Sequence, residues 1–233
     1  MKPITEIAQT LGLAADNLIP YGKFKAKIPL SAMSEGTKKG KLIVVTGITP
    51  TPAGEGKTTV TVGLAQGMGR IGKSVSATLR EPSLGPIFGI KGGGTGGGAS
   101  LVQPEDEVNI HFTGDAHAVG SAHNLLAALT DNVAQRGGID GFTPTGVTLR
   151  RVSDVEERSL RSIVTGLGGS SNAPVRETGF DIVTASEVMA ILALCSDLAD
   201  LRERLSKLVV GYTDAGAPVT AEDVGAVGSM MSL

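Results

Sequence analysis

The chain has 233 residues, a formal net charge of −2, 41% hydrophobic residues and 3% aromatic residues. This length and apolar content allow a sizeable aliphatic core, and the near-neutral charge offers no basic surface for nucleic acid or anionic membranes. No stretch approaches the roughly 20 apolar residues that cross a bilayer, the N-terminus lacks an apolar signal core, and the single cysteine, Cys195, excludes an internal disulfide. We therefore expect a cytoplasmic protein with no nucleic-acid or membrane partner.

The first part of the chain predicts a strand–loop–helix–strand unit. Residues 4–13 are expected to form a short helix, which a basic connector follows. Residues 42–46 form a continuous, β-branched apolar run that is typical of a strand buried on both faces. A helix over residues 58–71 and a second strand over 74–79 complete a unit whose strands should run parallel through a right-handed crossover.

Strand and helix patterns continue to alternate in the rest of the chain. The predicted elements are strands at 108–112, 147–151, 180–183 and 208–210, and helices at 116–129, 155–164, 186–195, 198–205 and after Thr220. This alternation indicates an α/β fold of the P-loop NTPase type, with a mainly parallel sheet and helices on both faces. We expect residues 1–40 to form an N-terminal helix and connector, and residues 41–233 to form a nucleotide-binding domain.

The strongest local motif lies between the first predicted strand and its helix. It matches the phosphate-loop pattern G-x-x-x-x-G-K-[ST], except that Thr51 stands at the first glycine position. Gly54 and Gly56 allow backbone N–H groups to approach phosphate oxygens, Lys57 can reach the terminal phosphates, and the Thr58 hydroxyl can hold Mg²⁺. The predicted ATP-binding residues are Thr51, Pro52, Ala53, Gly54, Glu55, Gly56, Lys57, Thr58 and Thr59. The alternative is an ordinary Gly/Pro-rich turn that ends in an exposed lysine.

Two further residues follow predicted strands, where a doubly wound sheet places its ligands. The Arg80 guanidinium can clamp a carboxylate and a transferring phosphoryl group, or it can simply pair with Glu81. Asp115 can bind Mg²⁺ through water or orient a substrate, or it can cap the helix that begins near Ala116. Lys57 and Arg80 are the candidate catalytic residues, and Thr58 and Asp115 are the candidate metal ligands.

Other features have simpler interpretations. The glycine run at 92–98 is either a flexible linker or a backbone wall beside a ligand, and the wall is favoured because linkers inside compact domains are uncommon. His111, His117 and His123 are evenly spaced, but six-residue spacing does not place them on one helical face, which disfavours a metal cluster. Cys195 lies on an apolar helical stripe and is expected in the core.

Four motifs in order resemble those of the formate–tetrahydrofolate ligases, also called 10-formyltetrahydrofolate synthetases. They lie at Thr49–Thr59, at Leu79–Pro86 with Phe88–Gly93, at His111–Asp115 with Ser121–Leu126, and at Gly179–Ile182 with Ala185–Ala190. The resemblance runs from about Pro20 to Val219. It implies an ATP-dependent ligase of one-carbon metabolism that makes formyl phosphate from formate and passes the formyl group to tetrahydrofolate.

The resemblance also implies that Arg80 holds formyl phosphate, that K⁺ acts as an additional cation, and that the protein is a homo-oligomer. The chain departs from the family at Ala99, where a tyrosine usually follows the glycine run. Family members are also longer, and their later folate- and adenine-binding domains are expected to be absent here. Two alternatives therefore stay open: an ATP-binding module of this family without full activity, which pairs with a partner that supplies the other domains, and another P-loop ATPase or carboxylate-activating ligase.

Overall fold

The computed structural model describes residues 1–32, 40–52, 54–81, 84, 94–110, 113–155, 157–169, 171–172 and 175–233. Its internal contacts divide the chain into two compact units. Unit 1 comprises Met1–Thr78 and Thr95–Val108, and unit 2 comprises Leu79–Gly94 and Asn109–Leu233. The predicted domain boundary between residues 40 and 41 stays a prediction.

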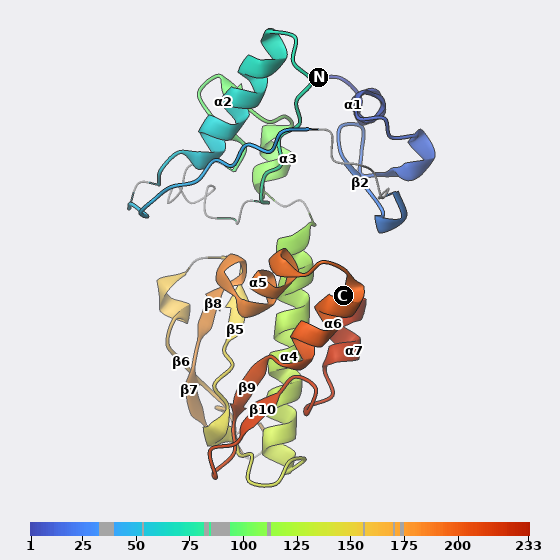
Figure 1. The fold of residues 1–233 in the computed structure, drawn as a ribbon. Helices are drawn as coiled ribbons and strands as arrows, with labels where there is room; N and C mark the ends of the chain where they lie inside the picture. The colour runs from blue at the N-terminus through green and yellow to red at the C-terminus, as the bar shows by residue number, and fades with distance from the viewer. Residues whose placement is uncertain are drawn as a thin grey trace. The chain divides into compact units, whose positions relative to one another are not determined.

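The structure is mixed α/β (Figure 1). The helices are α1 (Ile4–Thr10), α2 (Lys57–Arg70), α3 (Glu105–Ile110), α4 (Asp115–Arg136), α5 (Glu187–Leu194), α6 (Leu198–Ser206) and α7 (Val227–Ser232). The strands are β1 (Ile19–Pro20), β2 (Ala26–Lys27), β3 (Gly96–Gly97), β4 (Ser100–Leu101), β5 (Arg151–Ser153), β6 (Ile163–Thr165), β7 (Arg176–Thr178), β8 (Phe180–Ile182), β9 (Val209–Tyr212) and β10 (Pro218–Thr220). Among the described residues, no helix has the length and hydropathy that a membrane crossing requires.

The strands form five two-stranded sheets in the described part of the chain. Four pairs are antiparallel: β1 with β2, β3 with β4, β6 with β7, and β9 with β10. The pair β5–β8 is parallel, with Arg151 opposite Phe180 and Ser153 opposite Ile182. A parallel pair places the carboxyl ends of both strands at the same edge.

Unit 1 is built around α2. The glycine-rich hairpin β3–β4 packs on this helix. Near the N-terminus, the buried Lys25 ammonium pairs with the Glu107 carboxylate and lies 5.0 Å from the centre of the Tyr21 ring. A buried lysine is tolerated when a carboxylate pairs with it, so the basic connector has a structural use here.

Unit 2 contains most of the buried hydrophobic residues. The 22-residue helix α4 runs beside β5 and contacts α5 and α7. Leu126 and Phe142 are almost fully buried in this core, together with Leu208, Val210 and Val227.

Polar contacts fasten α4 to the strands beside it. The Asn124 side chain donates to Val152 O at 3.0 Å and accepts from Val152 N at 2.9 Å. Farther along the helix, the Asp131 carboxylate receives Arg151 Nη2 at 2.8 Å and Arg176 Nη2 at 2.5 Å. Because these bonds link α4 to β5 and β7, they fix how the helix lies against the strands.

Helix boundaries follow local capping chemistry. Ser186 precedes α5, and its hydroxyl accepts from Met189 N at 3.2 Å. Asp197 caps α6 in the same way through Asp200 N at 2.9 Å. Each side chain satisfies one of the N–H groups that the first helical turn leaves without a partner.

Several predicted elements are confirmed. The predicted helices at 4–13, 58–71, 116–129, 186–195 and 198–205 correspond to α1, α2, α4, α5 and α6, and the predicted strands at 180–183 and 208–210 correspond to β8 and β9. The strand predicted at 147–151 is displaced, because β5 covers Arg151–Ser153 and Val147 forms only an isolated bridge with Gly211. The helix predicted after Thr220 is α7, which starts only at Val227. Thr220 and Asp223 hydrogen-bond to each other in a turn that precedes it.

Two predictions were wrong. Residues 105–110 form α3 instead of a strand that begins at Val108, and three acidic residues in its first turn favour a helix N-terminus; residues 111–112 lie outside the described residues. The helix predicted at 155–164 is replaced by a short 3₁₀ turn at 158–160 and by β6. Pairing of β6 with β7 overrides the local helical pattern.

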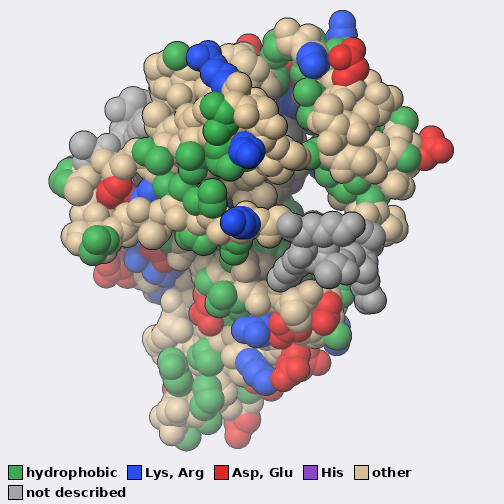
Figure 2. Space-filling model, turned by 45° about the horizontal axis from the view of Figure 1, so that its top comes forward, with side chains coloured by type: hydrophobic (Ala, Val, Ile, Leu, Met, Phe, Trp, Pro, Cys, Tyr) green, Lys and Arg blue, Asp and Glu red, His purple; other side chains and the backbone are tan. Residues whose placement is uncertain are grey.

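Residues 42–46 and 74–79 carry no strand assignment in the structure. Leu42 is 88% exposed and Val44 is 72% exposed, although their composition is that of a buried strand. Figure 2 shows hydrophobic side chains open on the face that it draws. Among the described residues, the parallel strand pair is β5–β8. The larger, mainly parallel sheet of the P-loop type stays a prediction.

Replacing Leu126 by alanine tests the importance of the α4 core. Leu126 is 0% exposed, so we expect the variant to lose about 2–5 kcal/mol of unfolding free energy through lost burial and a residual cavity. Urea unfolding followed by circular dichroism measures this loss. Leu194→Ala is the control, because Leu194 is 69% exposed; similar losses in both variants would contradict the assignment of the core.

Candidate functional site

The predicted phosphate loop leads directly into α2. Gly54 and Gly56 have φ angles of 80° and 71°, and Gly56 is the left-handed residue immediately before the helix. Glycine adopts this conformation without the steric cost that other residues meet. Gly54 N donates to Thr51 O at 3.1 Å, and Thr51 Oγ1 donates to Gly54 O at 3.1 Å. The loop is thus closed upstream of the helix by its own hydrogen bonds.

The loop gathers donors around one anionic group, the carboxylate of Glu55. Thr51 N donates to Glu55 Oε1 at 2.5 Å, and Lys57 Nζ pairs with Glu55 Oε2. The Lys57 hydrogen bond and then the Thr51 N–H hold the pKa of the Glu55 carboxyl below its usual value. A loop that stabilises a carboxylate in this way has the donor chemistry that phosphate oxygens require.

The start of α2 adds to this chemistry. The first N–H groups of a helix lack intrahelical acceptors and lie at the positive end of the helix dipole. Lys57, Thr58 and Thr59 are the first three residues of α2. The residues present therefore fit a nucleotide phosphate, with Lys57 as the charge and Thr58 as the hydroxyl beside it. Ala53, which we predicted in the same loop, lies outside the described residues.

The glycine run continues as a hairpin that packs on α2. Gly96 has a φ of 112°, and a Cβ atom there would collide with the Ser100 carbonyl oxygen. A Cβ at Gly97 would lie 3.2 Å from Thr59 Oγ1, and one at Gly63 on α2 would lie 3.1 Å from Ser100 Oγ. The described part of the run is therefore a closely packed hairpin and not a linker. Ala99 is exposed in its turn.

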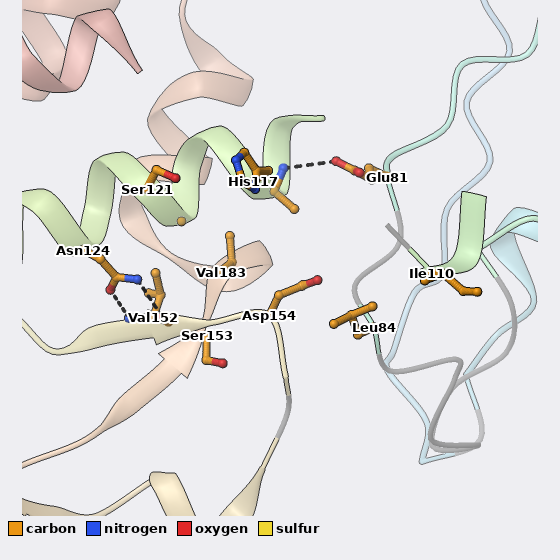
Figure 3. A pocket seen from close by; sticks show the side chains of 12 residues that line it. Glu81, Leu84, Ile110, His117, Ser121, Asn124, Val152, Ser153, Asp154 and Val183 are labelled. Atoms are coloured by element: carbon orange, nitrogen blue, oxygen red, sulfur yellow. Dashed lines mark hydrogen bonds between the residues drawn. The ribbon is translucent and has the colours of Figure 1, made fainter. Parts of the chain in front are cut away.

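A second candidate site lies within unit 2, in a cavity of about 370 Å³. It sits where β5 and β8 end and where α4 begins, which is the edge at which parallel sheets place ligands. Figure 3 shows His117, Ser121 and Asn124 along the helix, with Asp154 and Val183 across from them. The lining residues are Glu81, Leu84, Ile110, Ala116, His117, Gly120, Ser121, Asn124, Val152, Ser153, Asp154 and Val183.

Glu81 is held at the N-terminus of α4. Its carboxylate accepts from Gly114 N at 3.3 Å and from Ala116 N at 3.2 Å. Burial, followed by the neighbouring Asp115 carboxyl, raises the pKa of Glu81, and the two backbone N–H groups offset only part of this effect. Glu81 and Asp115 therefore form a carboxyl pair in which Glu81 holds its proton more strongly than an isolated glutamate does.

Asp115 is the first residue of α4, and its Oδ1 accepts from Ala116 N at 2.9 Å. The N-cap residue of α4 is Gly114, with no side-chain cap hydrogen bond, so the predicted alternative of Asp115 as the N-cap is wrong. Among the described residues, no group of three or more His, Cys, Asp or Glu side chains is arranged to hold a metal ion. The Mg²⁺ role predicted for Asp115 and Thr58 thus stays a prediction.

Arg80 lies at the same strand edge. Its Nη2 donates to Thr184 O at 2.9 Å, and Thr184 belongs to the 3₁₀ turn that follows β8. The side chain is exposed, so the guanidinium can reach a bound anion while one nitrogen is anchored to the backbone. The role of Arg80 in holding formyl phosphate, which the resemblance implies, stays a prediction.

The histidines have separate environments. His123 is buried on α4, its Nε2 lies 2.8 Å from Arg150 O, and burial lowers its pKa. His117 lines the unit 2 cavity, and His111 lies outside the described residues. His123 therefore links α4 to the residue that directly precedes β5.

The sequence interpretation missed Glu81 and Asp154 as residues of this cavity. Asp154 directly follows β5, and Glu81 directly follows Arg80. Glu81 and Asp154 could have been found by their positions at the ends of predicted strands. The sequence interpretation used this signal only for Arg80 and Asp115. Cys195, expected in the core, is partly exposed, and its thiol donates to Leu192 O at 3.1 Å.

Comparison with known proteins gives consistent matches over the whole chain. The family model described as formate–tetrahydrofolate ligase matches residues 1–233. The chain is 55% identical over 232 residues to formate–tetrahydrofolate ligase of Desulforamulus reducens, 52% over 233 to formate–tetrahydrofolate ligase 2 of Lactobacillus acidophilus, and 53% over 234 to formate–tetrahydrofolate ligase of Hyphomonas neptunium. These alignments cover 99%, 100% and 100% of this chain, but only 41%, 42% and 42% of the respective relatives.

The carboxyl pair predicts a pH-dependent effect of Glu81→Gln. Because the folded-state pKa of Glu81 is raised, its contribution to stability is fully present below the unfolded pKa and is lost as the pH rises through the folded pKa. The variant should therefore gain stability relative to the parent as the pH rises from 4 to 7. Urea unfolding across this range measures the difference. Glu222→Gln, which removes an exposed carboxyl, is the control, and a difference independent of pH would contradict the pair.

Proposed function

Because this chain belongs to the formate–tetrahydrofolate ligase family, we propose that its protein joins formate to tetrahydrofolate at the cost of ATP. The products are 10-formyltetrahydrofolate, ADP and phosphate, and we place the reaction in the cytoplasm. The observation that carries the proposal is the donor-rich loop before α2, which already stabilises an anion. The chain spans about two fifths of the length of the relatives that it matches, so the complete reaction is proposed for the whole protein.

The loop is the proposed ATP site of this chain. Lys57 places a positive charge at the terminal phosphates, and the N–H groups from Gly56 to Thr59 face the phosphate oxygens. Pro52 and Ala53 belong to the same predicted loop. Thr58, with Asp115 as a second candidate, is proposed to hold Mg²⁺, which shields the phosphate charge when it is bound. K⁺ is an additional cation that we propose only from the family resemblance.

We further propose that residues 42–46 and 74–79 are strands of a mainly parallel sheet of the P-loop type. Their β-branched composition supports this, as does their position on either side of α2 in the chain. The high exposure of Leu42 and Val44 supports it too, because such side chains are normally buried by a neighbouring strand or helix. In this arrangement, the phosphate loop connects the first strand to α2.

The proposed reaction has two steps. A formate oxygen attacks the terminal phosphorus of ATP, the bond to the bridging oxygen of ADP breaks, and formyl phosphate forms. The N10 amine of tetrahydrofolate then attacks the formyl carbon, phosphate leaves with the bonding electrons, and the amine proton is released. Phosphorylation is required because formate alone has no good leaving group.

Lys57 and Arg80 are the residues that we assign to the first step. Negative charge spreads over the transferring phosphoryl group, and cations placed around it lower the barrier. Arg80 lies at the carboxyl edge of β5–β8, where its guanidinium can bind two oxygens of formyl phosphate side by side. The later step needs a folate site, and we propose that the rest of the protein or a partner chain supplies it, within a homo-oligomer as the resemblance implies.

A second candidate function is ATP binding without full ligase activity. The observation that favours this candidate is Ala99, at a position where the family usually has tyrosine. A different P-loop ATPase is disfavoured, because the family match extends over residues 1–233 and not only over the loop.

Release of ADP from MgATP distinguishes these functions. The purified chain is assayed in K⁺ buffer with and without formate, and Arg80→Ala is assayed in parallel. Formate-dependent release that is lost in the variant supports the first chemical step in this chain. Formate-independent release would favour another ATPase, and no release with retained ATP binding would favour the binding module.

Lys57→Ala should abolish nucleotide-dependent stabilisation. A ligand that binds only the folded protein stabilises it by about 2.7 kcal/mol at a concentration 100 times its Kd, and the variant removes the main charge that we assign to phosphate binding. Thermal melting with and without MgATP measures the effect. Lys207→Ala serves as the control, because Lys207 is an exposed lysine paired with Glu203 on α6. A melting shift in Lys57→Ala equal to that of the parent would contradict the assignment.

A further inference from the structure

We propose that the Glu55 carboxylate occupies the phosphate position of the loop when no nucleotide is bound, and that it must swing out before ATP phosphate can enter. The inference rests on the proposed function, because it concerns the loop assigned to ATP. It adds a residue of the loop itself that competes with phosphate and so lowers the affinity for nucleotide.

Two donors of different kinds converge on Glu55. The backbone N–H of Thr51 donates to Oε1 at 2.5 Å, while the Lys57 ammonium pairs with Oε2. The Glu55 side chain is 19% exposed and the Lys57 side chain is 49% exposed. The carboxylate therefore turns into the loop although its neighbourhood is open to water, and it takes up the charge that we assign to phosphate binding.

Gly47 makes room for this arrangement. A Cβ atom at Gly47 would lie 3.2 Å from Glu55 Cγ and 3.6 Å from Lys57 Nζ. The first distance is tighter than ordinary contacts, so a side chain at position 47 would push the Glu55 chain outward. Gly47 follows the apolar run at 42–46, and it thus sets the space in which the Glu55 and Lys57 side chains meet.

The competition between Glu55 and phosphate follows from their charge. A carboxylate and a phosphate both present anionic oxygens to N–H and ammonium donors. They cannot use the same Lys57 ammonium and Thr51 N–H at the same time without strong repulsion between their oxygens. Bound phosphate must therefore displace Glu55, and the ion pair that is broken lowers the observed affinity.

Glu55→Gln separates this competition from a supporting role. Glutamine keeps the size of the side chain but loses the charge that pairs with Lys57. MgATP binding is measured by calorimetry at low ionic strength and neutral pH. We expect binding about two- to fivefold tighter than in the parent, which corresponds to the modest strength of an exposed ion pair.

A matched control is available on α6. Glu203 pairs with Lys207 at 2.7 Å, and both side chains are largely exposed. Glu203→Gln therefore removes the same kind of carboxylate and should leave MgATP affinity unchanged. Circular dichroism melting checks that both variants fold. If Glu55→Gln is unfolded, Glu55→Asp replaces it, because the shorter side chain cannot reach both donors and should also bind MgATP more tightly.

A direct readout separates displacement from simple charge repulsion. In the parent without nucleotide, the Thr51 amide proton should follow the ionisation of Glu55 in a pH titration by NMR. At saturating MgATP this dependence should disappear, because the carboxylate has left Thr51. Persistence of the titration in the complex would overturn the displacement proposal.

The binding outcomes distinguish the inference from the proposed function. Unchanged or weaker binding by folded Glu55→Gln, with normal binding by the parent, overturns the inference and leaves the ATP site intact. No binding by the parent overturns both claims. Tighter binding by Glu55→Gln, no effect of Glu203→Gln and loss of the Thr51 titration together support the displacement.

Discussion

The proposed ATP site depends on the turn that starts α2. Gly54 and Gly56 both have left-handed backbone angles, and together they turn the chain directly before α2. The N-terminus of the helix therefore follows immediately on the loop. The β3–β4 hairpin then packs on the same helix so closely that side chains at Gly63 and Gly97 would crowd Ser100 and Thr59. Glycine therefore acts twice here, first in forming the anion-binding turn and then in supporting the helix that carries it.

Carboxylates of the chain lie at the start of both α2 and α4. Glu55 pairs with Lys57 at the beginning of α2, and Glu81 accepts two backbone N–H groups at the beginning of α4. The two environments shift the pKa values of these carboxyl groups in opposite directions. The Lys57 ammonium lowers the pKa of Glu55, whereas burial and the nearby Asp115 raise that of Glu81. The Lys57 cation at one site and burial at the other account for these opposite pKa shifts, although both carboxylates lie at a helix start.

Local chemistry made some features predictable and left others out of reach. The loop and α2 could be read from consecutive glycine, lysine and threonine residues, and α4 from its helical pattern, because each depends on neighbours in the chain. The strand expected near Val108 was wrong because acidic residues at the start of α3 favour a helix. Residues 163–165 pair with residues 176–178, the next strand in the chain, and the local pattern of residues 155–164 does not reveal this partner. Glu81 and Asp154 meet in one cavity only through tertiary folding.

The most direct test is backbone-amide NMR of the chain as MgATP is added. The account predicts that the largest chemical-shift changes fall between Thr51 and Thr59, since these N–H groups and the first turn of α2 face the phosphates. Changes confined to amides outside this loop, or no changes at millimolar MgATP, would contradict the claim that this chain binds ATP through it.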